Sequence, residues 1–336
     1  MSTPRGDDRR ACVTLELLQR FHRVRLLLVG DLLADHYLYG QTERVSREAP
    51  VLIVRHESDA VQPGGGANAA ANARALGARV TAVGVVGRDA MGKELARLFR
   101  AQGIALEAVT GAGISTETRT RVLAGGVSTT RQQMLRIDRG ATGPLPPPIR
   151  RALARAIESA ARQADVVMVS DYAAGVLCDE TRAALRKIAS RGVPVSVDSR
   201  FALPTLTGFT VCKPNEPELS ALTGLSVRTD AEVAAAGKAA LKKLRSQALL
   251  VTRGRRGMML FERGQRPVAI PVHGADAAVD VTGAGDTVGA TFAVAVGARA
   301  SFLDAAWLAN VAGALVVQKP GTATVSRDEL ARELSR

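Results

Sequence analysis

Short runs of apolar residues alternate along most of the chain with longer segments whose apolar residues recur at helical spacing. Continuous apolar runs are typical of strands buried on both faces of a parallel sheet, and the segments between them predict the covering helices. We therefore expect an α/β fold, a doubly wound, mostly parallel sheet with helices on both faces. The predicted strands span residues 24–30, 79–86, 165–170, 193–198, 210–213, 248–252 and 258–261, and the predicted helices span residues 67–76, 92–102, 148–162, 180–191, 231–245, 284–296 and 302–318.

Two regions in the N-terminal half interrupt this alternation. Residues 37–56 and 116–138 carry short β-like stretches with no helix between them. They predict a small β subdomain that projects from the main sheet as a lid. Residues 1–22 are expected to be a tail leading into a short helix at residues 15–20, and residues 23–336 one domain that includes the lid.

The composition supports a folded chain and narrows the class of partner. Of 336 residues, 46% are apolar and 3% aromatic, and 45 basic against 32 acidic residues give a net charge of +13. This charge suits an anionic partner, but it is also explained by a general bias toward arginine. The chain has no dense basic run and few aromatic side chains for base stacking, so we expect a small anionic substrate and no nucleic acid.

The sequence also indicates a compartment. The three cysteines, Cys12, Cys178 and Cys212, lie far apart without a CxxC motif, which favours a reducing environment. The longest nearly apolar run is too short for a bilayer, and the N-terminus lacks an apolar signal segment. We therefore expect a cytoplasmic protein with no membrane partner.

The segment Asp280-Val-Thr-Gly-Ala-Gly-Asp286, followed by an apolar helical stretch, carries the strongest chemical signal. A glycine-rich turn that opens a helix presents free backbone N–H groups and the positive end of the helix dipole, which together bind anions. A carboxylate at the same place suits phosphoryl transfer, because it can accept the proton of the attacking hydroxyl. The alternative is a helix start with an acidic first turn and glycines for close packing.

Two further segments contain candidate ligand-binding residues. Pro63-Gly-Gly-Gly-Ala-Asn68 opens a predicted helix, and its glycines permit close approach of a ligand to the backbone, with Asn68 able to bond sugar hydroxyls. The alternative is a plain strand-to-helix turn capped by Asn68. Asp31 and Asp35 follow the first predicted strand, where two carboxylates suit a polyol; the alternative is a solvated loop.

These three motifs, in this order, resemble the ribokinase family of carbohydrate kinases, the PfkB-type sugar kinases. The resemblance runs from about residue 23 to residue 333 and implies the ribokinase-like fold and ATP-dependent phosphorylation of a sugar. Four stretches, residues 30–40, 44–50, 170–175 and 319–326, are similar to those of the family members that act on a heptose 7-phosphate. That resemblance implies phosphorylation of O1 of D-glycero-β-D-manno-heptose 7-phosphate in ADP-heptose and lipopolysaccharide inner-core biosynthesis.

The resemblance also implies a role for individual residues. Asp286 is expected to be the catalytic base, with Gly283, Ala284 and Gly285 forming the anion hole through their N–H groups. The remaining expected site residues fall into three groups, by ligand. Those for the sugar phosphate are Asp35, Gly65, Gly66, Asn68, Arg44, Arg121 and Asp171; those for ATP are Lys213, Asn215, Thr252, Gly254, Gly257, Asn310 and Gly313; those for metals are Asn215 and Glu218 for Mg²⁺ through water, and Asp280 and Thr282 for a monovalent cation such as K⁺.

Several features qualify these assignments. Ala174 stands where the compared kinases have a lysine, and Asp198-Ser-Arg200 stands where they have Asp-Pro-Lys, so Arg200 or Lys213 is expected to supply the missing cation. Arg44 and Arg121, expected to clamp the sugar's own phosphate, have the alternative of solvated positions on a β-face. The histidines are isolated and the chain ends at Arg336, so we expect a stand-alone kinase without a fused nucleotidyltransferase, and a homodimer.

Three other functions remain open from the sequence. A kinase of the same family could act on another sugar or a nucleoside, and a non-catalytic sensor could use the same fold. An NAD-dependent oxidoreductase also fits an α/β sheet, but it requires G-x-G-x-x-G directly after the first strand, where this chain has Gly30-Asp-Leu-Leu-Ala-Asp35.

Overall fold

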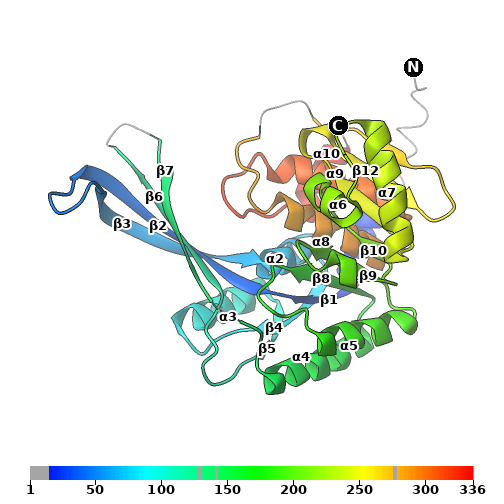
Figure 1. Cartoon of the computed structure of the whole chain (residues 1–336), viewed down its shortest axis with the longest axis horizontal. Coiled ribbons are helices and arrows are strands. Elements are labelled where there is room, and N and C mark those ends of the chain that lie inside the picture. Colours follow the sequence, from blue (N-terminus) through cyan, green and yellow to red (C-terminus); the bar gives the residue numbers. More distant parts are fainter. Residues whose placement is uncertain (1–14, 127–129, 141–142, 275–277, 336) are drawn as a thin grey trace.

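The computed structural model describes residues 15–126, 130–140, 143–274 and 278–335, and it is built on a nine-stranded sheet (Figure 1). The strands are β1 (Arg25–Gly30), β4 (Arg79–Val85), β5 (Ala105–Val109), β8 (Val166–Asp171), β9 (Val195–Ser199), β10 (Val211–Cys212), β11 (Ala248–Thr252), β12 (Met258–Glu262) and β13 (Val268–Ile270). Their order is β13-β12-β11-β10-β9-β8-β1-β4-β5, and only β12 and β13 pair antiparallel with their neighbours. The predicted, mostly parallel sheet is confirmed.

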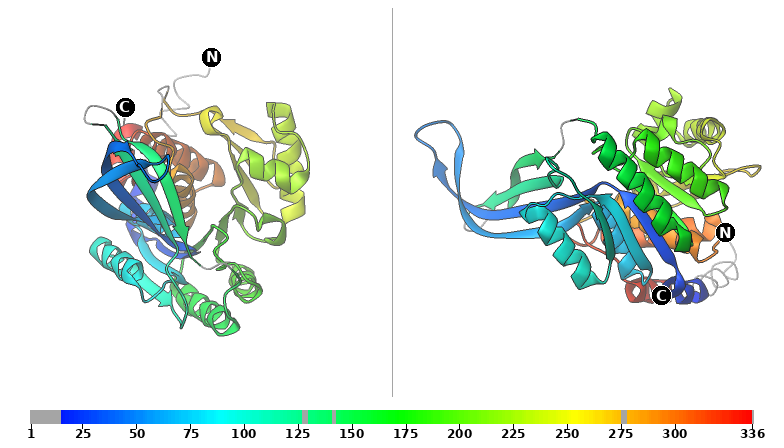
Figure 2. Two further views of the ribbon diagram at one scale, coloured as in Figure 1. Left: turned by 60° about the vertical axis from the view of Figure 1, so that its left-hand side comes forward. Right: turned by 90° about the horizontal axis from the view of Figure 1, so that it is seen from below.

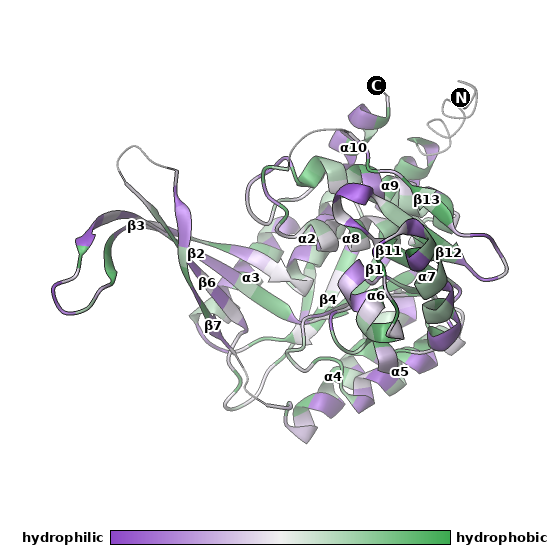
Figure 3. Cartoon of the chain, turned by 45° about the horizontal axis from the view of Figure 1, so that its top comes forward, coloured by the Kyte–Doolittle hydropathy of each residue, from purple (hydrophilic) through white to green (hydrophobic). Residues whose placement is uncertain are grey.

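Helices cover both faces of this sheet and divide the core in two. One face carries α2 (Gly66–Ala75), α3 (Ala90–Gln102), α8 (Ala284–Gly297), α9 (Phe302–Val316) and α10 (Arg327–Leu334); the other carries α4 (Pro147–Ala160), α5 (Asp179–Ser190), α6 (Glu216–Thr223) and α7 (Asp230–Leu244). Alternate residues of β1 face opposite cores: Leu26 and Leu28 the first, Leu27 and Val29 the second. In Figure 3, α4 and α5 alternate between hydrophilic and hydrophobic residues, as helices at a surface do.

A second sheet projects from the body and forms the feature that we call the lid sheet (Figures 1 and 2). Its strands β2 (Leu32–Val45), β3 (Leu52–Gly65), β6 (Thr118–Gly125) and β7 (Gln132–Arg139) lie in the order β3-β2-β6-β7. The two predicted β regions therefore do pair with each other. Both β2 and β3 are longer than the predicted stretches, and β2 begins directly after the end of β1.

Short elements complete the chain. Residues 15–20 are helical, as expected, and the 3₁₀ turns are Phe21–Arg23, Ala161–Gln163, Leu203–Thr205 and Gly254–Arg256. The sequence did not predict β5, β13, α6 or α10, which are short or lie beside prolines and polar residues. No helix within the described segments combines the length and the apolar character that crossing a membrane requires.

The strand order of the main sheet reverses at β1, and this reversal determines where a site can form. On one side β1 pairs with β4, and on the other it pairs with β8, with Gly30 opposite Ser170. Ligands of open α/β sheets bind beyond the carboxyl ends of the strands at such a switch point. The carboxyl ends of β1, β8 and β9 meet there, next to the first turns of α2 and α8.

Candidate active site

Asp286 lies in the first turn of α8 and is 3% exposed. The helix begins after Gly283, whose φ of 77° is in the left-handed region that glycine adopts without strain. A Cβ at Gly283 would lie 2.6 Å from Nδ2 of Asn68. Glycine is therefore required here both by the backbone conformation and by the close approach of α2.

Two side chains donate hydrogen bonds to the Asp286 carboxylate. Nδ2 of Asn68 lies 2.9 Å from Oδ2, and the hydroxyl of Tyr172 lies 2.7 Å from Oδ1. Burial raises the pKa of Asp286 to about 6, although the bonds from Asn68 and Tyr172 lower it, and the charge of Asp198 raises it further. A buried carboxylate with a pKa near neutrality is suited to accept a proton from a bound hydroxyl.

The orientation of the Asn68 amide is set by a chain of buried hydrogen bonds. Nδ2 of Asn72 donates to Oδ1 of Asn68 at 3.1 Å, and Oγ1 of Thr287 donates to Oδ1 of Asn72 at 2.9 Å. Because Oδ1 of Asn68 already accepts from Asn72, its Nδ2 is the atom directed at Asp286. Asn68, expected to bind the sugar, thus lies against the expected base.

The start of α8, where the anion hole is expected, leaves some backbone N–H groups without a backbone acceptor within the described segments. The N–H of Ala284 donates to the carbonyl oxygen of Val281 at 3.2 Å, so it is engaged within the turn. Among the described residues, the N–H groups of Gly283, Gly285 and Asp286 have no such partner, as is usual at a helix start. The N–H of Ala284 is thus bonded within the turn, and the anion hole that the sequence predicts here remains a prediction.

Asp35 and Arg121 form a buried ion pair, with Nη1 of Arg121 2.6 Å from Oδ1 of Asp35. The guanidinium also lies over the ring of Tyr37, 5.4 Å from its centroid. Close glycines bring β3 and α2 against this region: a Cβ at Gly65 would lie 2.6 Å from the Leu33 side chain, and the N–H of Gly66 donates to the carbonyl of Asp31. Gly65 and Gly66 thus pack against Asp31 and Leu33, whereas a Cβ at Gly64 would lie 2.6 Å from Oδ2 of Asp35.

Arg44 lies away from the Asp35–Arg121 ion pair. It lies exposed near the outer end of β2, and its guanidinium contacts the carbonyl oxygen of Val45 at 3.5 Å. Two other arginines lie beside Tyr172: Arg119, which the sequence interpretation did not select, and Arg200, which it named as a possible replacement for the missing lysine. The guanidiniums of Arg119 and Arg200 lie 5.0 and 4.9 Å from the centroid of the Tyr172 ring. Within the described segments neither has an acidic partner.

The two-residue period of a β-strand could have identified Arg119 from the sequence. It stands two residues before Arg121 in the predicted β region 116–138, so both side chains lie on the same face of β6. Burial lowers the pKa of Arg119, an effect that the charge of Asp35 opposes. A half-buried guanidinium without an acidic partner is a site for an anion.

The carboxylates of Asp31 and Asp171 both accept backbone N–H groups. Asp31 is 2% exposed, and its oxygens accept the N–H groups of Tyr172, Ala174 and Val176. The interpretation of Asp31 as a polyol ligand is therefore wrong. Asp171, also expected to bind substrate, accepts hydrogen bonds from the N–H of Ala173 and the hydroxyl of Ser199.

Lys213 supplies a buried cation beside the start of α8. Its Nζ lies 2.8 Å from Oδ2 of Asp198 and 3.8 Å from where a Cβ at Gly285 would be. Burial lowers the pKa of Lys213, but the charge of Asp198 and its hydrogen bond outweigh burial and raise the pKa. Lys213 is therefore a permanent positive charge next to the free N–H groups.

Asn215 and Glu218 cap α6 reciprocally. Oδ1 of Asn215 accepts the N–H of Glu218, and the Glu218 carboxylate accepts both the N–H and Nδ2 of Asn215. Burial raises the pKa of Glu218. Each carboxylate oxygen keeps a lone pair, so the cap and a water-mediated ion contact are compatible. Among the described residues no three His, Cys, Asp or Glu side chains gather as a metal site.

The other residues expected at the nucleotide lie in tight backbone and packing positions. Gly254 and Gly257 have φ of 55° and 76°. Thr252 forms an isolated parallel β-bridge with Asn215, and Nδ2 of Asn310 donates to the carbonyl oxygen of Pro271 at 2.7 Å. A Cβ at Gly313 would lie 3.0 Å from Val288, so Gly313 permits α9 to pack closely on α8. Their contacts with ATP remain a prediction.

Asp280 holds the loop before α8. Its oxygens accept the N–H groups of Thr282 at 2.8 Å and Gly321 at 2.9 Å, which join residues 280–282 to the turn after α9. Burial raises the pKa of Asp280, but these hydrogen bonds outweigh burial and lower it. Asp280 is therefore a charged carboxylate in a fixed position.

Comparison with known proteins identifies the family. Residues 25–329 match the pattern of the pfkB family carbohydrate kinases. Similar proteins include the bifunctional protein HldE of Azorhizobium caulinodans, 41% identical over 315 residues, and that of Caulobacter vibrioides, 40% identical over 309 residues. The matches cover 93% and 91% of this chain but 64% and 62% of those proteins, so the chain spans somewhat less than two thirds of their length.

Solved structures share the fold over 93% of the chain. Arabidopsis thaliana ribokinase, complexed with ribose and ATP, is 25% identical with a TM-score of 0.73 over 99% of its own chain. Phosphofructokinase-2 from Escherichia coli, in complex with substrates and products, is 19% identical with a TM-score of 0.76 over its whole chain. The chain belongs to the pfkB family of carbohydrate kinases.

Proposed function

We propose that this kinase transfers the γ-phosphoryl group of ATP to O1 of D-glycero-β-D-manno-heptose 7-phosphate. The product would be the 1,7-bisphosphate, a precursor in ADP-heptose and lipopolysaccharide inner-core biosynthesis. The observation that carries the proposal is the buried Asp286 carboxylate beside Tyr172, whose ring is flanked by two arginines without acidic partners. The motifs shared with heptose 7-phosphate kinases support the choice of sugar.

In the proposed reaction Asp286 accepts the proton of the O1 hydroxyl. The O1–H bond breaks, a bond forms between O1 and the γ-phosphorus, and the bond to the β,γ-bridging oxygen breaks, so that ADP leaves. The free N–H groups at the start of α8 and the Lys213 ammonium would stabilise negative charge on the migrating group. Asn68 and Tyr172 would hold the carboxylate in place.

The sugar's own phosphate would bind Arg119 and Arg200. Both guanidiniums lie about 5 Å from the Tyr172 ring centroid, so a dianion near the ring edge would meet two cations. Ala174 stands where the compared kinases have a lysine. Arg200, beside the Tyr172 ring, would supply a cation instead. Arg121 is committed to Asp35, and this pair would contact sugar hydroxyls.

Metal ions would enter at two places. Asn215 and Glu218 would hold Mg²⁺ through water, which suits an ion that keeps its water ligands and travels with nucleotide phosphates. Mg²⁺ supplies charge neutralisation on the transferred phosphate. Asp280 and Thr282 would contribute to a K⁺ site, and the Escherichia coli phosphofructokinase-2 was solved in complex with potassium.

The lid sheet would join two copies into a homodimer that works in the cytoplasm. Its strands and the β2–β3 turn expose large apolar side chains that a second copy could cover. These are Val45, Val51, Leu52, Met134, Leu135 and Ile137. The oligomeric state is measured by analytical ultracentrifugation, and a monomer at micromolar concentration would contradict this part of the proposal.

The substrate is tested by ADP release with Mg-ATP. The panel is heptose 7-phosphate, the unphosphorylated heptose, ribose, fructose 6-phosphate and adenosine, each run with the wild type and with Asp286→Asn. We expect turnover with heptose 7-phosphate and its loss in the variant. Turnover confined to another acceptor would overturn the substrate, and ATP binding without any turnover would favour a sensor.

A further inference from the structure

Tyr172 lies on the segment that joins β8 to α5, residues 172–178, which we call the Tyr172 loop. Its hydroxyl donates to Asp286, and its half-buried side chain has the guanidiniums of Arg119 and Arg200 beside the ring. Burial and the negative charges of Asp286 and Asp198 hold the pKa of Tyr172 well above its usual value. The hydroxyl is therefore a permanent proton donor toward Asp286.

The near end of the Tyr172 loop is attached to Asp31. Oδ2 of Asp31 accepts the N–H of Tyr172 at 2.7 Å and that of Ala174 at 3.1 Å, and Oδ1 accepts the N–H of Val176 at 3.2 Å. Ala173, between them, has a φ of 65°, which a residue with a side chain adopts only where its surroundings compensate. One carboxylate thus holds a strained turn closed.

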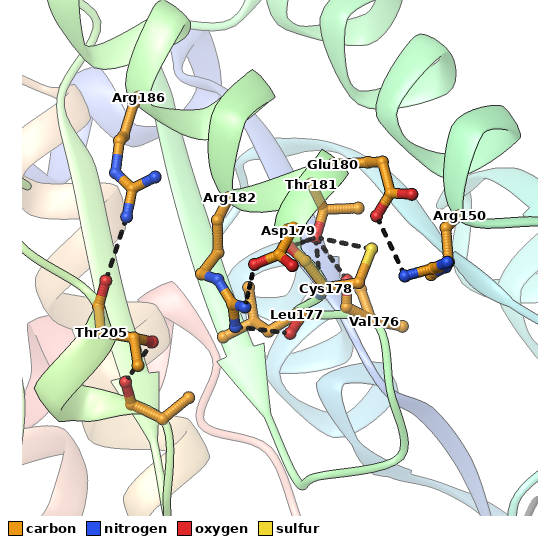
Figure 4. A network of polar contacts seen from close by, with 11 residues as sticks. Arg150, Val176, Leu177, Cys178, Asp179, Glu180, Thr181, Arg182, Arg186 and Thr205 are labelled. Atoms are coloured by element: carbon orange, nitrogen blue, oxygen red, sulfur yellow. Dashed lines mark hydrogen bonds and ion pairs between the residues drawn. The ribbon is translucent and has the colours of Figure 1, made fainter. Parts of the chain in front are cut away.

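The far end is attached to the start of α5, as Figure 4 shows. Oγ1 of Thr181 donates to the carbonyl oxygen of Val176 at 2.6 Å, and the N–H of Cys178 donates to Oγ1 of Thr181 at 3.0 Å. Val176 is therefore bonded through its N–H to Asp31 and through its carbonyl to Thr181. The loop has little freedom to withdraw Tyr172 from Asp286.

We propose that Tyr172 is a positioning residue that orients the catalytic carboxylate of Asp286, and that Asp31 acts through the Tyr172 loop to keep it there. The role of Asp286 as base rests on the proposed function; the contact itself does not. The other groups around Asp286 are Asn68 from α2, Asp198 at the end of β9 and Lys213 after β10. Tyr172 is the hydroxyl donor among them.

The first test follows the Asp286 carboxyl by ¹³C NMR in protein labelled at aspartate, without any substrate. Asp286→Asn identifies the Asp286 resonance and separates it from Asp31, whose pKa burial and the Asp171 charge raise to about 6. Tyr172→Phe keeps the ring and removes the hydroxyl, so the pKa of Asp286 should rise by about half a pH unit or more. Tyr39→Phe, a matched change on the lid sheet, should leave the pKa of Asp286 unchanged.

The second test asks whether Asp31 acts through Tyr172. In Asp31→Asn an NH2 group, which cannot accept, replaces one carboxylate oxygen, so one or two of the three N–H groups lose their acceptor. The loop should then loosen, and the Asp286 pKa should rise as in Tyr172→Phe. The double variant should then show no further rise. Thr181→Val releases the other end of the loop and provides the same test if Asp31→Asn does not melt cooperatively.

Kinetics completes the test with whichever sugar the wild type phosphorylates. Tyr172→Phe should lower kcat by about tenfold or more, leave KM for the sugar within about threefold, and move the acidic limb of the kcat profile to higher pH. An Asp286 pKa that does not move in Tyr172→Phe would overturn the proposal, as would additive shifts in the double variant. Because the NMR result needs no substrate, it stands even if heptose 7-phosphate is not the acceptor.

Discussion

The carboxylate of Asp35 and the guanidinium of Arg121 form an ion pair that joins β2 to β6 with side chains only 3% and 13% exposed. Removing one partner of such a pair leaves a buried charge unpaired. We therefore expect Arg121→Met to lower the free energy of unfolding by about 3–5 kcal/mol. The double variant Asp35→Asn/Arg121→Met should regain most of this loss. Urea titration measures both, and equal losses in the single and double variants would contradict the pairing.

The buried charge of Asp286 should cost stability at neutral and higher pH. A pKa of about 6, against the ordinary aspartate value of 3.8, corresponds to a cost of about 3 kcal/mol above pH 6. Because the folded-state pKa is raised, this cost vanishes as the pH falls toward the unfolded-state value. Asp286→Asn should thus be more stable than the wild type by about 1–3 kcal/mol at pH 8, with the gain roughly halved at pH 5. A variant less stable at both pH values would show that its hydrogen bonds outweigh the charge.

Arg119 and Arg200 should determine affinity for the phosphate of the sugar. Replacing either by methionine removes a charge-assisted contact worth about 1.5–3 kcal/mol, so KM for the sugar phosphate should rise about 10- to 100-fold. KM for ATP should stay within about twofold. Arg55→Met, on the outer part of β3, is the matched control. An equal rise in KM for ATP would place these arginines at the nucleotide instead.

Gly283 should be needed for activity beyond its backbone conformation. Gly283 and Gly192 have φ of 77° and 86°, but a Cβ meets Asn68 only at Gly283 and open space at Gly192. Alanine at either position should cost about 1 kcal/mol of stability, because both backbones are left-handed. Only Gly283→Ala should also lower kcat, since it displaces the Asn68 amide from Asp286. Equal activity in both variants would contradict the importance of that contact.

The residues that sequence reasoning identified are those whose chemistry is written into a contiguous segment. Asp286 and its glycine turn form one string, and Asn68 follows its three glycines, so each could be assigned without the fold. Tyr172 was missed because its role depends on a contact with a residue 114 positions away. Asp31 was misassigned because a carboxylate at the end of a strand serves a ligand or a backbone loop equally well. Only the structure shows that its oxygens are occupied.

The same reasoning applies to the fold. Continuous apolar runs predicted seven strands of the main sheet, because burial on both faces leaves a plain pattern. The lid strands β2 and β3 carry mixed polar and apolar residues, since a projecting sheet is half-exposed, and their full length could not be predicted. Arg44 and Arg121 both lie on the lid sheet. The pairing of β2 with β6, which the sequence does not show, places Arg121 beside Asp35 and Arg44 at the exposed outer end of β2.

The most direct measurement of the central claim is ³¹P NMR of the product formed from Mg-ATP and heptose 7-phosphate. The account predicts a new phosphate resonance coupled to the anomeric proton, with the 7-phosphate retained and ADP formed in equal amount. Asp286→Asn should bind ATP and form no such product. ADP released with only inorganic phosphate, or a new phosphate on a different hydroxyl, would contradict the claim.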